Sequence, residues 1–306
     1  MRTQPSSPTV LFLEILERLG IDPRTLAASP THRNGRLVVG NSEPTLGKLW
    51  EFFRIVDVVA AITANLNSGR VNRGQRALPF AGMDFSAGNG AYPCPMANGR
   101  FEPVVGTSLQ LLDAVVRHRL DYRLALIDRD ADVLQQLETH VHTACAQLHI
   151  YPGRVRVLKG SVADVAVPWI QQHVQPWMPG LIVIDTNEVF DDRGLLAIGE
   201  LPQLNMVDVA LHLPAAMGKW PRRRQPQATL DQVRNAFHKP FWQLPPSRGN
   251  FQWTWLYGTK NPRMRVLKER GFVDADSADG LDRLDRFRTT RKERALRQQL
   301  EMQLDG

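Results

Sequence analysis

The sequence has few cysteines and no long apolar run, and each shortage excludes a class of protein. Its 306 residues include two cysteines, Cys94 and Cys145, too few for a disulfide-stapled scaffold or a four-cysteine zinc site. No apolar stretch reaches the ~20 residues of a membrane span, and no small-residue cleavage site follows the apolar residues near the N-terminus. We therefore expect a soluble, cytoplasmic protein that does not bind a membrane.

Lysine is also scarce, with 7 residues against 31 arginines and 31 acidic residues, which gives a net charge of +7. A positive balance permits an anionic partner such as nucleic acid, and the planar fork of arginine suits phosphate. An arginine bias follows equally well from a GC-rich genome. Hydrophobic residues make up 43% of the chain, which is ample for a packed core.

Hydrophobic periodicity changes once along the chain. Helical spacing predicts a helix over residues 45–65, and polar residues 65–75 are typical of a linker. Short apolar runs then alternate with helical segments, which predicts an α/β fold with a doubly wound, mostly parallel sheet covered on both faces. The predicted strands are residues 77–85, 122–127, 154–158, 181–184, 206–213 and 251–257.

This pattern divides the chain into three parts. Residues 1–70 form an N-terminal helical segment, residues 71–262 the α/β domain, and residues 263–306 a basic helical tail. The tail is most simply a solvated helix, with a nucleic-acid contact as the alternative.

A glycine-containing loop follows the first predicted strand. It reads D-x-S-x-G-x-G, from Asp84 through Ser86 and Gly88 to Gly90. Glycine lets the backbone turn tightly and approach a ligand where a side chain would clash. A ligand bound here would lie at the carboxyl end of the strand, near a helix N-terminus.

Later strands deliver polar side chains to the same edge. Asp128 follows the second strand, Asp164 the third, and residues 185–188 the fourth. An acid after the second strand can accept both hydroxyls of a ribose, and one after the third can accept a hydrogen bond from an adenine amino group. Together these positions predict a site for an adenosyl cofactor.

Residues 77–261 resemble the class I S-adenosylmethionine-dependent methyltransferases. The resemblance implies a Rossmann-like, seven-stranded sheet whose last two strands form a hairpin that includes residues 251–257. It also implies S-adenosylmethionine as the cofactor. The residues that would hold it are Asp84, Ser86, Gly88, Gly90, Asp128 and Asp164.

Three short motifs look most like a narrower group, the three-Cys-motif partner proteins of bacteria and phages. They are Phe80-Ala81-Gly82, Gly106-Thr107-Ser108 and Ile184-Asp185.

The fourth strand departs from the pattern of the methyltransferases that act on adenine or cytosine amines. Those enzymes carry Asp/Asn-Pro-Pro-aromatic there, which grips the amine and stacks on the flipped base. Here both prolines are missing and the aromatic residue comes late, as Phe190. Asp185 or Asn187 could still hold an amine and Glu188 could act as a base, but base methylation and catalysis itself stay open. No cysteine follows the strand, so the usual nucleophile for carbon-5 pyrimidine methylation is missing.

Two further segments allow more than one interpretation. Residues 91–105, rich in proline, are either a lid or substrate loop, or a long surface insertion. The densest basic run follows the fifth strand and is either a phosphate-binding patch or a solvated loop. Its residues are Lys219, Arg222, Arg223 and Arg224.

A metal site is not expected. His142, Cys145 and His149 could share a helix face, but a lone helix rarely closes a zinc site.

Two functions are therefore favoured over a third. The first is a methyltransferase acting on a macromolecule, most simply nucleic acid, with Asp185, Asn187 and Glu188 facing the acceptor. The alternative is a methyltransferase-fold module without turnover that binds nucleic acid or a protein partner. A nicotinamide-dependent oxidoreductase ranks last, because the third small residue of G-x-G-x-x-G/A is missing after Gly90.

Overall fold

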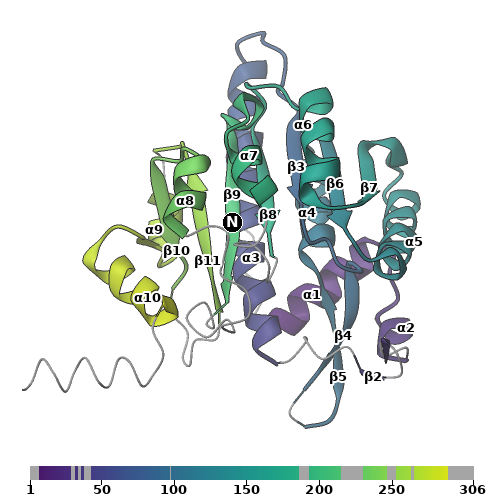
Figure 1. Ribbon diagram of the computed structural model, residues 1–306. Coiled ribbons are helices and arrows are strands. Elements are labelled where there is room, and N and C mark those ends of the chain that lie inside the picture. The colour runs from purple at the N-terminus through teal and green to yellow at the C-terminus, as the bar shows by residue number, and fades with distance from the viewer. Residues whose placement is uncertain are drawn as a thin grey trace, which may run out of the picture.

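Figure 1 shows a computed structural model of the chain. It describes residues 7–28, 32–33, 36–37, 43–96, 98–185, 193–214, 230–246, 253–262 and 265–288.

A mixed, mostly parallel sheet of eight strands forms the centre of the molecule (Figure 1). The strands are β3 (Phe80–Asp84), β6 (Tyr122–Asp128), β7 (Val155–Lys159), β8 (Gly180–Ile184), β9 (Val207–Pro214), β10 (Phe241–Leu244), β11 (Trp253–Thr259) and β12 (Val273–Asp274). Their order is β12-β10-β11-β9-β8-β3-β6-β7.

Five neighbouring strands of this sheet, from β9 to β7, run parallel. Strand β11 lies antiparallel between β9 and β10, so the last long strands form the expected hairpin. Strand β12 pairs antiparallel with β10 at the edge, which adds an eighth strand to the seven that the resemblance implies.

Helices cover both faces of the sheet and bury two separate cores. Along β8, Leu181 and Val183 belong to one core, and Ile182 and Ile184 to the other, as the two-residue period of a strand requires. The first core also holds residues of α1 (Pro8–Arg18), α3 (Glu43–Val71), α4 (Thr107–Arg117) and α5 (Ala131–Gln147). The second holds residues of α6 (Val167–His173), α7 (Arg193–Gly199), α8 (Leu230–Ala236) and α10 (Ala278–Arg288).

Helix α3 is longer than predicted, and the interpretation of residues 65–75 as a linker is wrong for its first half. The helix continues to Val71 because its polar residues find partners without breaking it. The Asn67 side chain donates to Leu78 O at 2.9 Å and accepts from Leu78 N at 2.8 Å. Ser68 Oγ donates to Ala64 O, one helical turn back.

Residues 91–105 form a β-hairpin. Strand β4 (Ala91–Pro95) pairs antiparallel with β5 (Phe101–Val105), and Pro93 lies opposite Pro103, so two residues without a backbone N–H share one position of the ladder. Helices α1, α2 (Pro23–Ala28) and α3 contact the hairpin, which projects beyond the main sheet (Figure 1). Whether it closes over a substrate stays a prediction.

Ion pairs fasten the N-terminal helices to α4. Arg18 Nε lies 2.8 Å from Asp113 Oδ1, and Arg117 Nη1 lies 2.7 Å from Asp57 Oδ1. Although burial opposes it, His118 and Arg117 lower the pKa of Asp57 to about 2. The N-terminal helices thus share both a core and charge pairs with the α/β domain.

Strands β3 and β8 pack closely at Gly180, the first residue of β8. A Cβ built there would lie 2.0 Å from Ala81 O in β3. We expect Gly180→Ala to lower the free energy of unfolding by at least about 2 kcal/mol, because the two central strands must separate. Gly69→Ala in α3 is the control. A Cβ there meets only Arg73 Nη1, at 3.6 Å, so this variant should gain about 0.5–1 kcal/mol. Urea denaturation midpoints measure both, and a wild-type midpoint for Gly180→Ala would contradict the packing described.

Candidate functional site

The glycine loop begins at a fully buried carboxylate. Asp84, at the end of β3, is 0% exposed. Its Oδ2 accepts a hydrogen bond from Thr107 Oγ1 at 2.6 Å and its Oδ1 accepts one from Ser86 N at 3.1 Å. Burial raises the pKa of Asp84 to about 7, against the effect of these two donors. Asp84 therefore ties the loop to the first residue of α4, and a direct contact with a cofactor stays a prediction.

The two glycines of the loop serve different purposes. Gly88 has φ +57°, and a Cβ built there would have Ser86 O, 4.0 Å away, as its nearest neighbour. Gly90 has φ +80°, but a Cβ there would lie 2.7 Å from Leu137 Cδ1. Gly88 is thus the point where a ligand can approach the backbone, whereas Gly90 lets α5 pack closely.

Asp128 joins the end of β6 to this open point. Its Oδ2 accepts a hydrogen bond from Gly88 N at 3.1 Å, and its Oδ1 accepts one from Asp130 N at 3.1 Å. Each carboxylate oxygen keeps a second lone pair. The structure therefore brings Asp128 and the glycine loop together, which is the arrangement expected of a ribose-binding acid.

Asp164 lies at the start of a short helical turn, η2 (Val162–Ala166). Its Oδ2 accepts a hydrogen bond from Ser161 Oγ at 2.6 Å. It also lines a hollow along β7 together with Tyr122 and Arg156. Its predicted contact with an adenine stays a prediction.

The strand order reverses direction next to the glycine loop. From β3 the chain proceeds to β6 and β7 on one side, and then returns to β8 and β9 on the other. Ligands of open α/β sheets bind at the carboxyl ends of the strands where this reversal occurs. Here Asp185 N donates to Ser86 Oγ at 2.9 Å, so the residue after β8 is bonded to the loop after β3.

Asp185 is the centre of a partly buried charge cluster. Lys48 Nζ, from α3, lies 2.7 Å from Asp185 Oδ2, and His212 Nδ1, from β9, lies 2.8 Å from Asp185 Oδ1. Burial alone would raise the pKa of Asp185, but Lys48 and His212 hold it well below its usual range. The carboxylate is therefore ionised at neutral pH, and both of its oxygens have cationic or imidazole neighbours.

The indole ring of Trp255 packs against one side of this cluster. Trp255, in β11, donates from Nε1 to Lys48 O at 2.9 Å, and its ring centroid lies 5.3 Å from that of His212. His212 is 6% exposed. Its Nδ1 lies 2.8 Å from Asp185 Oδ1 but is not aligned for a hydrogen bond, and its Nε2 has no hydrogen-bond partner among the described residues. A buried imidazole nitrogen without a partner calls for a functional explanation.

Lys48 and His212 were not predicted from the sequence. The available signal was a single polar residue within an apolar segment, lysine in the helix and histidine in the strand. Such a signal does not show which distant carboxylate the residue meets.

Several predicted residues lie outside the part of the chain that the structure describes. They are Asn187, Glu188, Lys219, Arg222, Arg223 and Arg224. Their predicted roles at the acceptor and at phosphates stay predictions.

The described residues contain no group of three or more His, Cys, Asp or Glu side chains that could hold a metal ion. None of the helices described there combines the length and apolarity needed to cross a bilayer.

No protein-family model and no curated protein matches the sequence. Among solved structures, a Legionella pneumophila protein is 14% identical with a TM-score of 0.41, covering 70% of this chain and 90% of that one. A human methyltransferase 10 domain containing protein is 10% identical with a TM-score of 0.39, covering 69% of this chain and 82% of that one. Aeropyrum pernix fibrillarin, in complex with natively bound S-adenosyl-L-methionine, is 8% identical with a TM-score of 0.37, covering 63% and 73%.

These likenesses are too loose to add an argument, so the assignment of the fold depends on the strand order. That order, with β11 antiparallel inside the sheet, is typical of class I methyltransferases, and the chain has this fold. The narrower resemblance to the three-Cys-motif partner proteins finds no support.

The buried carboxylate of Asp84 predicts a pH dependence of stability. Its pKa rises from the ordinary 3.8 to about 7 on folding, so the folded state binds the proton more tightly than the unfolded state. The stability of the wild type should therefore fall, relative to Asp84→Asn, as pH rises from about 4 to about 7. Asparagine keeps an oxygen and an amide for Ser86 and Thr107 but does not ionise.

Urea denaturation of both proteins at several pH values measures this difference. A constant difference between them across the range would contradict the raised pKa of Asp84.

Proposed function

We propose that the chain is an S-adenosylmethionine-dependent methyltransferase that acts on a macromolecule, with nucleic acid as the favoured class. The observation that carries the proposal is the open backbone at Gly88, bonded to Asp128 where the strand order reverses. This is where an open α/β sheet binds a nucleotide-like ligand.

The residues present fit an adenosyl cofactor. A side chain at Gly88 would fill the space beside the loop, and the free lone pairs of Asp128 suit ribose hydroxyls. Gly88 and Asp128 would hold the ribose, while Asp84 and Ser86 fix the loop from behind. S-Adenosylmethionine supplies an activated methyl group on a sulfonium, so the protein has to position an acceptor and, where needed, remove its proton.

The Asp185 cluster is suited to that task. With Lys48 beside it, Asp185 stays ionised and holds His212 by its Nδ1 side. His212 Nε2 is then the atom that takes a proton from a hydroxyl or amine of the acceptor, and Asp185 stabilises the imidazolium that forms. In this role Asp185 orients His212 rather than gripping an exocyclic amine itself.

The preference for nucleic acid is supported by arginine and aromatic side chains beside β7, the edge strand of the sheet. Arg123 and Arg156 line a hollow of about 970 Å³ along β7, beside Tyr151, which is 73% exposed. Burial and the charges of Arg123 and Arg156 lower the pKa of His173 there. Exposed aromatic rings beside arginines stack bases and hold phosphates.

The second candidate function is a methyltransferase-fold binding module without turnover. It is favoured by the completeness of the Asp185 cluster, where both carboxylate oxygens already have partners. Both candidates predict cofactor binding, and they differ only in turnover.

Calorimetric titration with S-adenosylmethionine and S-adenosylhomocysteine, with NAD as a control ligand, tests the cofactor site. We expect micromolar binding of the adenosyl compounds. Asp128→Asn should weaken it about tenfold to a hundredfold, since hydrogen bonds to a charged group contribute about 1.5–3 kcal/mol. Asp132→Asn is the matched control, because it removes the same charge from the exposed first turn of α5. Equal affinities in two folded variants would sink the assignment of Asp128.

A labelled-methyl assay over DNA, RNA and protein then separates the two candidates. Label transfer that is lost in His212→Asn supports the enzyme. Tight cofactor binding without transfer to any of the three supports the module.

A further inference from the structure

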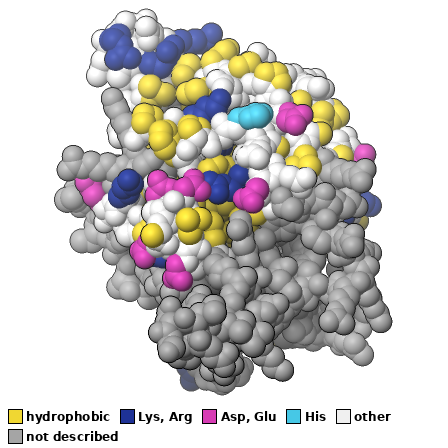
Figure 2. Space-filling view, turned by 60° about the vertical axis from the view of Figure 1, so that its left-hand side comes forward, with side chains coloured by type: hydrophobic (Ala, Val, Ile, Leu, Met, Phe, Trp, Pro, Cys, Tyr) yellow, Lys and Arg dark blue, Asp and Glu magenta, His cyan; other side chains and the backbone are white. Residues whose placement is uncertain are grey.

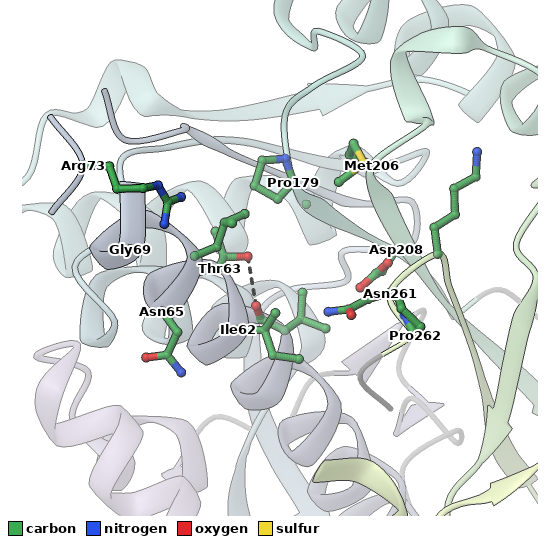
Figure 3. A pocket seen from close by; sticks show the side chains of 14 residues that line it. Ile62, Thr63, Asn65, Gly69, Arg73, Pro179, Met206, Asp208, Asn261 and Pro262 are labelled. Atoms are coloured by element: carbon green, nitrogen blue, oxygen red, sulfur yellow. Dashed lines mark hydrogen bonds between the residues drawn. The ribbon is translucent and has the colours of Figure 1, made fainter. Parts of the chain in front are cut away.

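A second hollow lies at the opposite edge of the sheet from the glycine loop. It has a volume of about 710 Å³ and lies between the second half of α3, the amino ends of β8 and β9, and the residues after β11 (Figure 3). The proposed function makes no use of it, and its size is that of a pocket for a small molecule.

One face of α3 forms the floor of the hollow. Val59, Ile62, Leu66 and Gly69 follow one another at three- and four-residue spacing along this face, which places them in one row. Leu66 is 41% exposed, and Met206 on the facing wall is 44% exposed. The hollow thus has an exposed large apolar side chain on each of two facing walls.

Positive charge lies beside this apolar row. Arg73 follows the end of α3, and its Nη1 lies 3.6 Å from where a Cβ of Gly69 would be. Lys260 lines the far side and donates to Asn205 Oδ1 at 2.5 Å. Figure 3 shows Arg73 at one end of the hollow, with Asp208 and Asn261 at the other.

Asp208 is the acidic residue that lines the hollow, and its carboxylate is hydrogen-bonded to neighbouring side chains. Its Oδ2 accepts a hydrogen bond from Tyr257 Oη at 2.5 Å. Burial raises the pKa of Asp208 to about 6, against the effects of Thr259, Tyr257 and Lys239. Arg73 and Lys260 therefore leave the hollow with an excess of positive charge.

We propose that this hollow binds a small amphipathic anion. An apolar ring or chain lies against Leu66 and Met206, and a carboxylate, sulfonate or phosphate lies beside Arg73. A protein partner fits less well, because a stable interface takes ~800 Å² from each side, whereas the exposed large apolar side chains of the hollow are Leu66 and Met206 among the described residues. In Figure 2, apolar side chains (yellow) lie next to Lys and Arg side chains (dark blue) at the top of the view.

The proposal can be tested by a substitution at Gly69 that fills the hollow. A leucine at this position would occupy the row between Leu66 and Arg73, and replacing a mid-helix glycine favours the helix. Ser68 is the matched control, because it is the preceding residue of α3 and is exposed. Ser68→Leu adds the same side chain outside the hollow.

The probe is 8-anilinonaphthalene-1-sulfonate, which joins an aromatic body to one negative charge. We expect saturable binding of one probe per chain by fluorescence titration. Gly69→Leu should weaken it at least tenfold, and Ser68→Leu should leave it unchanged. Equal weakening by both variants, or none by either, would overturn the assignment of the hollow.

The uncharged probe N-phenyl-1-naphthylamine tests the charge preference. It has nearly the same aromatic body but no sulfonate, so it should bind more weakly than the sulfonate to the wild type. Arg73→Gln should remove that difference, while folding and S-adenosylmethionine binding stay as in the wild type. A preference for the sulfonate that survives Arg73→Gln would contradict the role of Arg73.

Discussion

A partly buried carboxylate lies at the centre of the sheet's carboxyl edge, and helix α3 supplies the positive charge that neutralises it. Asp185 lies directly after β8, at a level of burial where an unpaired charge would cost several kcal/mol. Lys48 supplies the opposite charge, and it does so from a helix that precedes the whole α/β domain. Because Trp255 donates to the backbone of Lys48, the same contact also fixes β11 against α3. Removing Lys48 would leave the carboxylate of Asp185, which is 13% exposed, without its cationic partner.

Helix α3 connects the two ends of the sheet. With 29 residues it is about 44 Å long, enough to pass from the carboxyl edge, where Lys48 meets Asp185, to the amino edge, where its last turns form the floor of the apolar hollow. One helix therefore contributes side chains to the charge cluster at one edge of the sheet and to the hollow at the other. A ligand in the hollow would contact the same rigid element that holds the charge cluster, although nothing requires the two sites to be coupled.

Much of the fold could be predicted from the sequence, because strands buried on both faces are short apolar runs that end in polar residues. The second strand was predicted at 122–127 and is found at Tyr122–Asp128. The meeting of Gly88 with Asp128 follows from the same logic, since carboxyl ends of parallel strands lie at one edge. The hairpin of β4 and β5 was missed because prolines suggest a loop, and pairing Pro93 with Pro103 is a tertiary solution. Lys48 was missed because its partner lies 137 positions away, beyond any local pattern.

The charge cluster also changes what the altered fourth-strand motif means. In an amino-methyltransferase the acid after this strand grips the acceptor, so losing the two prolines would argue against activity. Here the acid lies beside Lys48 and His212, and both ring nitrogens of His212 lack a well-aligned hydrogen bond among the described residues. The proton-accepting function would thus have moved from the fourth strand to the fifth. The altered motif is then consistent with a different assignment of roles on the same fold. In that assignment Asp185 orients His212, and His212 accepts the proton of the acceptor.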